Sequence, residues 1–116
     1  MKVHKLDYFY SDSELPPYLP YPRFLLDIPI GMTPRLVYAE LLARSSASRF
    51  NGWVDDKGRV YVIYTLADLA RDIDRCPTQV KRALAELEEF DLIHRVSSTT
   101  RAKRIYVRFP PDKNDP

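Results

Sequence analysis

The chain carries TLADLARDI at residues 65–73, DRC at 74–76, PTQVKRALAELEEFDLI at 77–93 and HRVSSTTRAKRIYVR at 94–108. The first and third segments place apolar residues at helical spacing, and the short segment between them fits a tight turn. The last segment holds two strand-like runs separated by basic residues. The order helix, turn, helix, strand, loop, strand is that of a winged helix-turn-helix, a unit that usually docks on duplex DNA.

Capping residues mark both helices of this stretch. Thr65 is a favourable N-cap for the first helix. Cys76 takes the N-cap position of the second helix, which Gln79 would complete as a capping box. Asp74 lies in the turn, where aspartate tolerates a left-handed backbone. We expect the second helix to run to about Phe90 and to bury Val80, Ala83, Leu84 and Leu87.

Residues 33–64 supply the remaining elements of the predicted domain. Thr33 followed by Pro34 predicts a helix start, and the serine-rich run SSAS at 45–48 predicts its end near Arg44. Segments 53–54 and 59–64 lie on either side of a turn at Gly58 and predict a β-hairpin whose second arm pairs with the wing. The predicted fold class is therefore α+β, a winged helix-turn-helix with three helices and a β-hairpin wing.

The length of 116 residues suits one compact domain, which we place at residues 33–109. Residues 1–32 are rich in proline and aromatic residues, which favours an extended but ordered arm. Its rings are too apolar for a free tail, so we expect them to pack on the chain's own core or, as the alternative, on a partner subunit. Residues 110–116 have the composition of a linker.

The net charge of +2 is too small to indicate nucleic acid by itself, but the cations are unevenly distributed. Between Arg75 and Arg108, eight basic residues stand against four acidic ones, and no residue from Arg95 to Arg108 is acidic. A cationic region on a near-neutral protein suits contact with phosphates.

The second helix and the wing hold the candidate DNA-binding residues. Opposite the apolar stripe, the helix carries side chains that suit base edges or phosphates, namely Thr78, Gln79, Lys81 and Arg82. The wing adds four cations, Arg95, Arg101, Lys103 and Arg104, of which the direction of Arg104 depends on strand register. The alternatives are a solvated helix face with ion pairs to Glu86 and Glu89, and an ordinary solvated hairpin.

The sequence contains no pattern typical of a catalytic, cofactor or metal site. His4 and His94 lack metal-ligand spacing, and no phosphate-binding glycine motif or nucleophile elbow is present. Cys76 could be a reactive thiol at a helix N-terminus, but we favour a cysteine that replaces a serine cap. We therefore expect a protein that is not an enzyme and needs no metal or cofactor.

Cysteine usage and hydropathy indicate the compartment. The single cysteine allows no internal disulfide, which fits a reducing cytoplasm. No run of about 18 apolar residues exists, and the N-terminal segment MKVHKLDYFYSDSELPPY lacks the apolar stretch of a secretory signal. We expect a cytoplasmic protein without a membrane partner.

The succession of several longer segments resembles one family. LDYFY at 6–10, YPRFLL at 21–26, TPRLVYAELLARSSAS at 33–48 and NGWVDDKGRVYVIYTLADLA at 51–70 precede RALAELEEFDLI at 82–93 and IYV at 105–107. This succession is similar to the N-terminal domain of plasmid replication initiator protein A, found on theta-replicating plasmids and mobile elements of low-GC Gram-positive bacteria. The resemblance spans roughly residues 5–108, and NGWVDDKGRVYVIYT is its most specific part.

The resemblance implies a winged helix that binds repeated sites in double-stranded origin DNA, usually as a homodimer. It also implies a separate C-terminal domain that recruits host replication proteins. The family's contact positions correspond here to Thr78, Gln79, Lys81 and Arg82 in the helix and to Arg101 and Lys103 in the wing. The wing lacks the family's glycines, and Asp91 stands where a glycine often ends the helix. The alternatives are a transcriptional regulator on the same scaffold and a winged helix used only for protein assembly.

Overall fold

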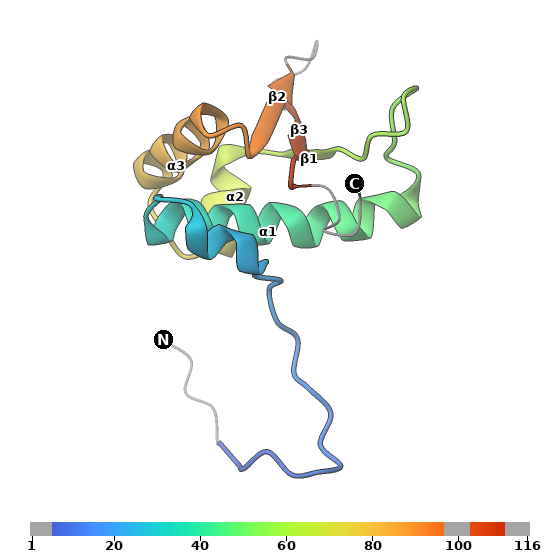
Figure 1. Ribbon diagram of the computed structural model, residues 1–116, viewed down its shortest axis with the longest axis vertical. Coiled ribbons are helices and arrows are strands. Elements are labelled where there is room, and N and C mark those ends of the chain that lie inside the picture. Colours follow the sequence, from blue (N-terminus) through green and yellow to red (C-terminus); the bar gives the residue numbers. More distant parts are fainter. Residues whose placement is uncertain (1–5, 97–102, 111–116) are drawn as a thin grey trace.

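The computed structural model describes residues 6–96 and 103–110. Along the chain lie the short 3-10 helix η1 (Arg23–Asp27), the long helix α1 (Met32–Ser48), the 3-10 turn η2 (Arg49–Asn51) and strand β1 (Val62–Tyr64). Helices α2 (Leu66–Asp72) and α3 (Pro77–Glu89) and strands β2 (Ile93–Val96) and β3 (Lys103–Val107) follow. The helices pack on one side of the sheet (Figure 1), and the predicted α+β winged helix-turn-helix is confirmed.

Helix α1 is longer at both ends than the sequence predicted. It begins after Gly31, whose carbonyl accepts a hydrogen bond from the Arg35 N–H at 3.3 Å, so Thr33 is not the N-cap. The serine-rich run continues the helix to Ser48 instead of ending it. Ser45 is buried, and its hydroxyl donates to the Leu41 carbonyl at 2.8 Å, which satisfies its polar group inside the helix.

Helices α2 and α3 both end with an aspartate in the left-handed conformation. Asp74 has a φ of 55° and Asp91 a φ of 58°. After α3, the Asp91 N–H donates to Glu88 and the Leu92 N–H to Leu87, at 3.0 and 2.9 Å. This pair of bonds is a Schellman motif, and the same pair follows α2. The turn predicted at Asp74 is confirmed, and Asp91 ends α3 in the conformation that a glycine would adopt there.

The three strands form an antiparallel sheet in the order β1-β3-β2, so β1 pairs with the returning wing strand as predicted. Only a single bridge, Val54 to Val60, joins the two arms of the upstream hairpin around Gly58. Because side chains alternate along a strand, the register defines two faces. The inner sheet face carries Val62, Tyr64, Ile93, Arg95, Lys103, Ile105 and Val107, and the outer sheet face carries Ile63, His94, Val96, Arg104 and Tyr106.

One apolar core joins the helices to the inner sheet face. Val37, Leu41, Val80 and Leu87 are fully buried in it, together with Leu25 from η1. The predicted stripe of α3 is confirmed, because Val80, Ala83, Leu84 and Leu87 are its buried residues. The burial of these side chains leaves the opposite side of α3 in solvent and fixes which residues it presents.

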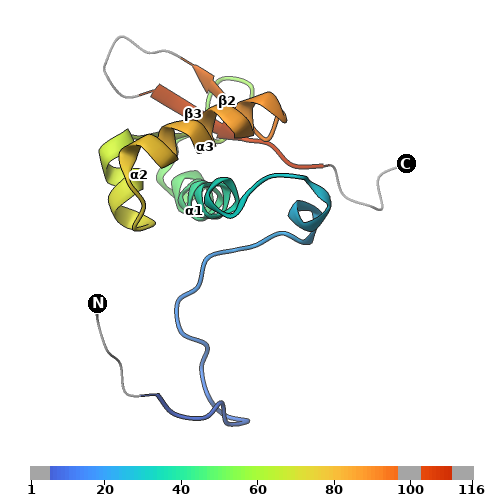
Figure 2. The ribbon, with the colours of Figure 1, turned by 90° about the vertical axis from the view of Figure 1, so that its left-hand side faces the viewer.

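Residues 6–19 of the N-terminal arm do not pack on this core. Residues 6–19 run away from the domain (Figures 1 and 2), and Tyr8, Phe9 and Tyr18 are between 75% and 82% exposed. The prediction that the arm's rings cover the chain's own core is therefore wrong for this segment. Only its end is anchored, where the Phe24 ring meets the Tyr38 ring edge-on at 5.8 Å and Leu25 is buried.

Candidate nucleic-acid interface

Helix α3 presents a polar face to solvent. Thr78, Gln79, Lys81, Arg82 and Ala85 are all exposed, and α3 lies at the front of the molecule with β2 and β3 above it (Figure 2). The predicted recognition residues of the helix are therefore together on one accessible surface. Ala85 has no side chain beyond Cβ, so a partner can approach the helix backbone closely at that position.

Lys81 and Arg82 carry charges that have no acidic partner in the part of the chain that the structure describes. Within residues 6–96 and 103–110, neither side chain forms an ion pair, and Glu86 and Glu89 hold no cation either. The ion pairs to Glu86 and Glu89 that belong to the alternative of a solvated helix face are therefore not found among the described residues. Two adjacent cations beside small and uncharged polar residues suit an anionic partner.

Gln79 is exposed, and its side chain also caps the start of α3. Its Oε1 accepts a hydrogen bond from the Cys76 N–H at 3.3 Å, which forms the predicted capping-box contact. The amide oxygen is thus occupied, while the amide nitrogen stays accessible at the start of α3. The Gln79 side chain therefore has fewer hydrogen-bonding groups available for a base edge than a free glutamine. Lys81 and Arg82 become the principal candidates for DNA contact.

Arg95 is tied to α3. Its guanidinium donates to the Glu88 carboxylate through Nε at 2.9 Å and through a second nitrogen, and its side chain is only 22% exposed. The hydrogen bonds from Arg95 hold the pKa of Glu88 below its usual range, and the charge of Lys103 lowers it further. The Glu88–Arg95 pair joins the first wing strand to the helix, so Arg95 positions the wing.

Strand register separates the two described cations of the returning wing strand. Lys103 is exposed on the inner sheet face, the face of Arg95, and so belongs to the surface beside α3. Arg104 lies on the outer sheet face, where its guanidinium stands over the Tyr61 ring at 4.3 Å. The predicted wing contact at Arg101 lies outside the described residues.

The outer sheet face neighbours a ladder of rings rather than a row of free charges. Trp53 stacks on Tyr61 at 6.3 Å, Tyr61 meets Tyr106 at 5.9 Å, and Tyr106 meets His94 at 6.2 Å. Arg59 is paired with Asp55 at 2.9 Å and stands over Tyr106 at 5.0 Å. These cations have carboxylate or aromatic partners, unlike those of α3.

Glu88 and its bond to Arg95 are the part of this surface that the sequence did not indicate. The two residues are seven positions apart, and one lies on a helix and the other on a strand. Neither helical nor strand periodicity brings such positions together, so the pair follows only from the way β2 packs beside α3.

Within the described ranges, no three His, Cys, Asp or Glu side chains gather as metal ligands would. None of the helices described in the structure has the length and apolar content needed to cross a bilayer. Cys76 is an exposed free cysteine at the start of α3.

Comparison with known proteins identifies relatives of the whole domain. A family model described as the N-terminus of replication initiator protein A (RepA) matches residues 28–111. The match covers α1, the helix-turn-helix and both wing strands. The comparison with curated proteins gave no match.

Several solved structures share the fold. One, described as an MDR initiator, is 24% identical with a TM-score of 0.69 and covers 84% of this chain and 81% of that chain. A second, the N-terminal domain of a DNA-binding protein, is 18% identical with a TM-score of 0.71 over 95% and 88% of the two chains. A third, from a Rep–DNA complex, is 18% identical with a TM-score of 0.70 over 90% and 85%. These likenesses establish the fold.

Proposed function

Because the chain belongs to the family of the replication initiator protein A N-terminus, we propose that it binds repeated duplex sites in the replication origin of a plasmid or mobile element. The observation that supports this most directly is the exposed face of α3, on which Lys81 and Arg82 have no acidic partner among the described residues. Relatives described as an MDR initiator and as part of a Rep–DNA complex share the fold.

In the proposed complex, α3 enters the major groove with its exposed face toward the bases. Arg82 reads base edges, since a guanidinium can form two hydrogen bonds with guanine. Lys81 and the Thr78 hydroxyl contact phosphates, which fix the orientation of the helix. Gln79 contributes its amide nitrogen, because its oxygen holds the Cys76 N–H.

The wing contacts the backbone beside the groove. Lys103 supplies this contact from the inner sheet face, and Arg101 adds a second phosphate contact. Arg95 keeps the wing in place through Glu88, and Arg104 supports the outer sheet face by its cation–π contact with Tyr61. Sequence selectivity then comes from α3, whereas much of the affinity comes from phosphate contacts and depends on salt.

The protein acts in the cytoplasm. It acts as a homodimer, because two copies on adjacent repeats double the length of DNA that is read. Host replication proteins are recruited by a further C-terminal domain of the initiator. The domain limits of 33–109, with an arm at 1–32 and a linker from 110, are part of the same proposal.

The test is a titration of the chain against duplexes that carry direct repeats from its own gene region and against shuffled duplexes of equal composition. We expect the repeat duplex to bind at least about a thousandfold more tightly, as specific sites usually do. Fluorescence anisotropy at several fixed salt concentrations measures both constants. Equal affinity for repeat and shuffled duplexes would overturn the proposal of origin recognition.

A further inference from the structure

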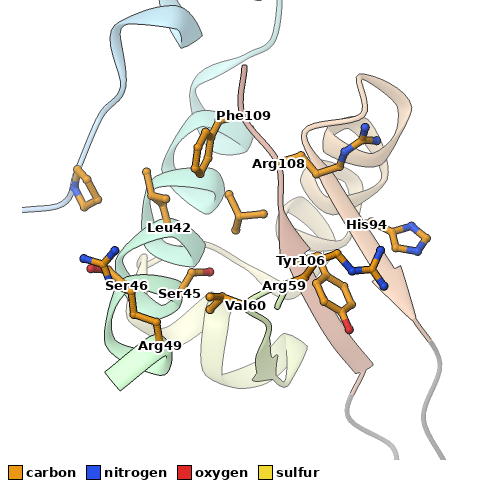
Figure 3. A pocket seen from close by; sticks show the side chains of 12 residues that line it. Leu42, Ser45, Ser46, Arg49, Arg59, Val60, His94, Tyr106, Arg108 and Phe109 are labelled. Atoms are coloured by element: carbon orange, nitrogen blue, oxygen red, sulfur yellow. The ribbon is translucent and has the colours of Figure 1, made fainter. Parts of the chain in front are cut away.

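A pocket of about 880 Å³ lies on the side of the domain between α1 and strand β3 (Figure 3). Its walls combine apolar side chains with arginines, among them Leu42, Val60, Val107, Arg49, Arg59 and Arg108. None of the lining residues is acidic. The pocket therefore has an apolar interior and a cationic rim, and the proposed interface of α3 contributes no residue to it.

The arm has the complementary chemistry. From residue 6 to residue 22 it contains three acidic residues, Asp7, Asp12 and Glu14, and no basic residue. Seven large apolar side chains of the same segment are at least 41% exposed: Leu6, Tyr8, Phe9, Tyr10, Leu15, Tyr18 and Leu19. Exposed rings in this number indicate a segment that binds another surface.

The ring-bearing end of the arm has local order. The Ser13 N–H donates to the Tyr10 carbonyl at 3.1 Å, and the Tyr10 N–H donates to the Ser13 hydroxyl at 2.9 Å. The Asp7 carboxylate accepts from the Tyr8 N–H at 2.8 Å. These bonds hold the chain in a turn and reduce the entropy that binding would cost.

The proline-rich part of the arm directs this turn away from its own domain. Prolines at 16, 17, 20 and 22 restrict residues 15–22 to extended backbone. An extended segment of this length spans roughly 25 Å at about 3.1 Å per residue. Pro20 lies at the edge of the pocket. The rings of residues 8–10 could therefore enter the pocket of their own chain only if the backbone reversed sharply just before Pro20.

We propose that the arm of one copy of this chain docks in the pocket of a second copy. Tyr8, Phe9 and Tyr10 enter the apolar interior, and the acidic residues face Arg49 and Arg108 at the rim. Arg59 contributes less, because Asp55 already pairs with it at 2.9 Å. Arg108 lies 3.8 Å from the Asp91 carboxylate, so Arg49 is the principal cation of the rim. Two such exchanges in a symmetric pair would form the dimer, which leaves α3 of both copies free for DNA. The inference rests on the proposed homodimer but not on the proposed DNA binding.

A charge-reversal experiment tests this docking without DNA. Asp7→Lys, Asp12→Lys and Glu14→Lys together should weaken dimerisation by at least about tenfold, because like charges then meet at the rim. Arg49→Glu with Arg108→Glu should have the same effect, and the combination of all five changes should restore much of the lost affinity. Sedimentation equilibrium measures each dimer, and Lys57→Glu, at an exposed turn outside the pocket lining, is the matched control.

A spin-label experiment separates exchange between copies from folding back within one copy. Tyr10→Cys is labelled with a nitroxide in a Cys76→Ser background and mixed with isotope-labelled chain. Broadening of the Leu42 and Val107 amide signals in the mixture supports the proposal. A monomeric parent chain, a dimer insensitive to both reversals, or broadening only when label and isotope share one chain would each overturn it, whereas loss of DNA binding alone would not.

Discussion

Lys81 and Arg82 on α3 have the same charge as Arg59 and Arg104 near the outer sheet face, but their surroundings differ. Arg59 is paired with Asp55, and Arg104 stands over the ring of Tyr61. The two cations of α3 extend into solvent, and within the described part of the chain they have no acidic partner. Cations with internal partners support the fold, whereas cations without them remain available to an outside anion.

The sharpest test of this difference exchanges one arginine from each region for alanine. Arg82→Ala should weaken binding to the repeat by about 1–3 kcal/mol, roughly fivefold to 150-fold, because a base contact is lost. Arg104→Ala is the matched control and should change binding less than about threefold, since Arg104 lies on the outer sheet face over the ring of Tyr61. Anisotropy titration at one salt concentration measures both. Equal losses in the two variants would remove the distinction between the regions.

Lys103 should behave as a phosphate contact. Lys103→Ala should weaken repeat and shuffled duplexes by the same factor and lower the slope of log affinity against log salt by about 1. Lys57→Ala, at an exposed turn, serves as the control and should leave the slope unchanged. A loss confined to the repeat duplex would mean that Lys103 reads sequence instead.

Glu88→Gln converts Arg95 from a cation with an internal acidic partner into a cation without one. The substitution weakens the hold on Arg95 and removes a negative charge beside Lys103. Binding to shuffled duplexes should then rise a few-fold, while the preference for the repeat falls because the wing is less firmly held. The ratio of the two dissociation constants is the readout. Unchanged affinity for both duplexes would show that the ion pair does not influence the interface.

The smallest effect concerns the acid stability of the region around Asp55. Burial of its carboxylate would raise the pKa, but hydrogen bonds from Arg59 and from the Lys57 N–H outweigh this and lower the pKa to about 2. Because the folded pKa is below the ordinary value of 3.8, the stabilisation is complete above that value and is lost as the pH falls toward about 2.

Asp55→Asn should therefore flatten the dependence of unfolding free energy on pH in this acidic window. Urea denaturation of both proteins at the two ends of the window gives the comparison, and Asp56→Asn, at the neighbouring exposed position, is the control. A wild-type protein whose stability rises as the pH falls through the window would contradict the sign of this argument.

The helix-turn-helix was predictable because its signals are local. The apolar stripe of α3 repeats at helical spacing, and Gln79 and Asp74 occupy positions that capping and turn chemistry define. The same stripe fixes the opposite face, so the exposure of Lys81 and Arg82 followed from sequence alone.

The remaining features depend on contacts between distant positions. The serine-rich run prolongs α1 because Ser45 is buried and bonds to the Leu41 carbonyl, and its composition alone predicted the reverse. Strand register, which no local pattern specified, places Lys103 and Arg104 on opposite faces. The arm was expected on the core because it is apolar, but residues 6–19 run away from the domain (Figure 1) and their rings stay exposed.

The most direct test of the central claim maps the DNA-facing surface by amide chemical shifts during titration with the repeat duplex. The largest changes should occur at residues 78–85 of α3 and at Lys103, with small changes at Ile63, His94 and Tyr106 of the outer sheet face. Changes concentrated on the outer sheet face, with α3 unaffected, would contradict this claim.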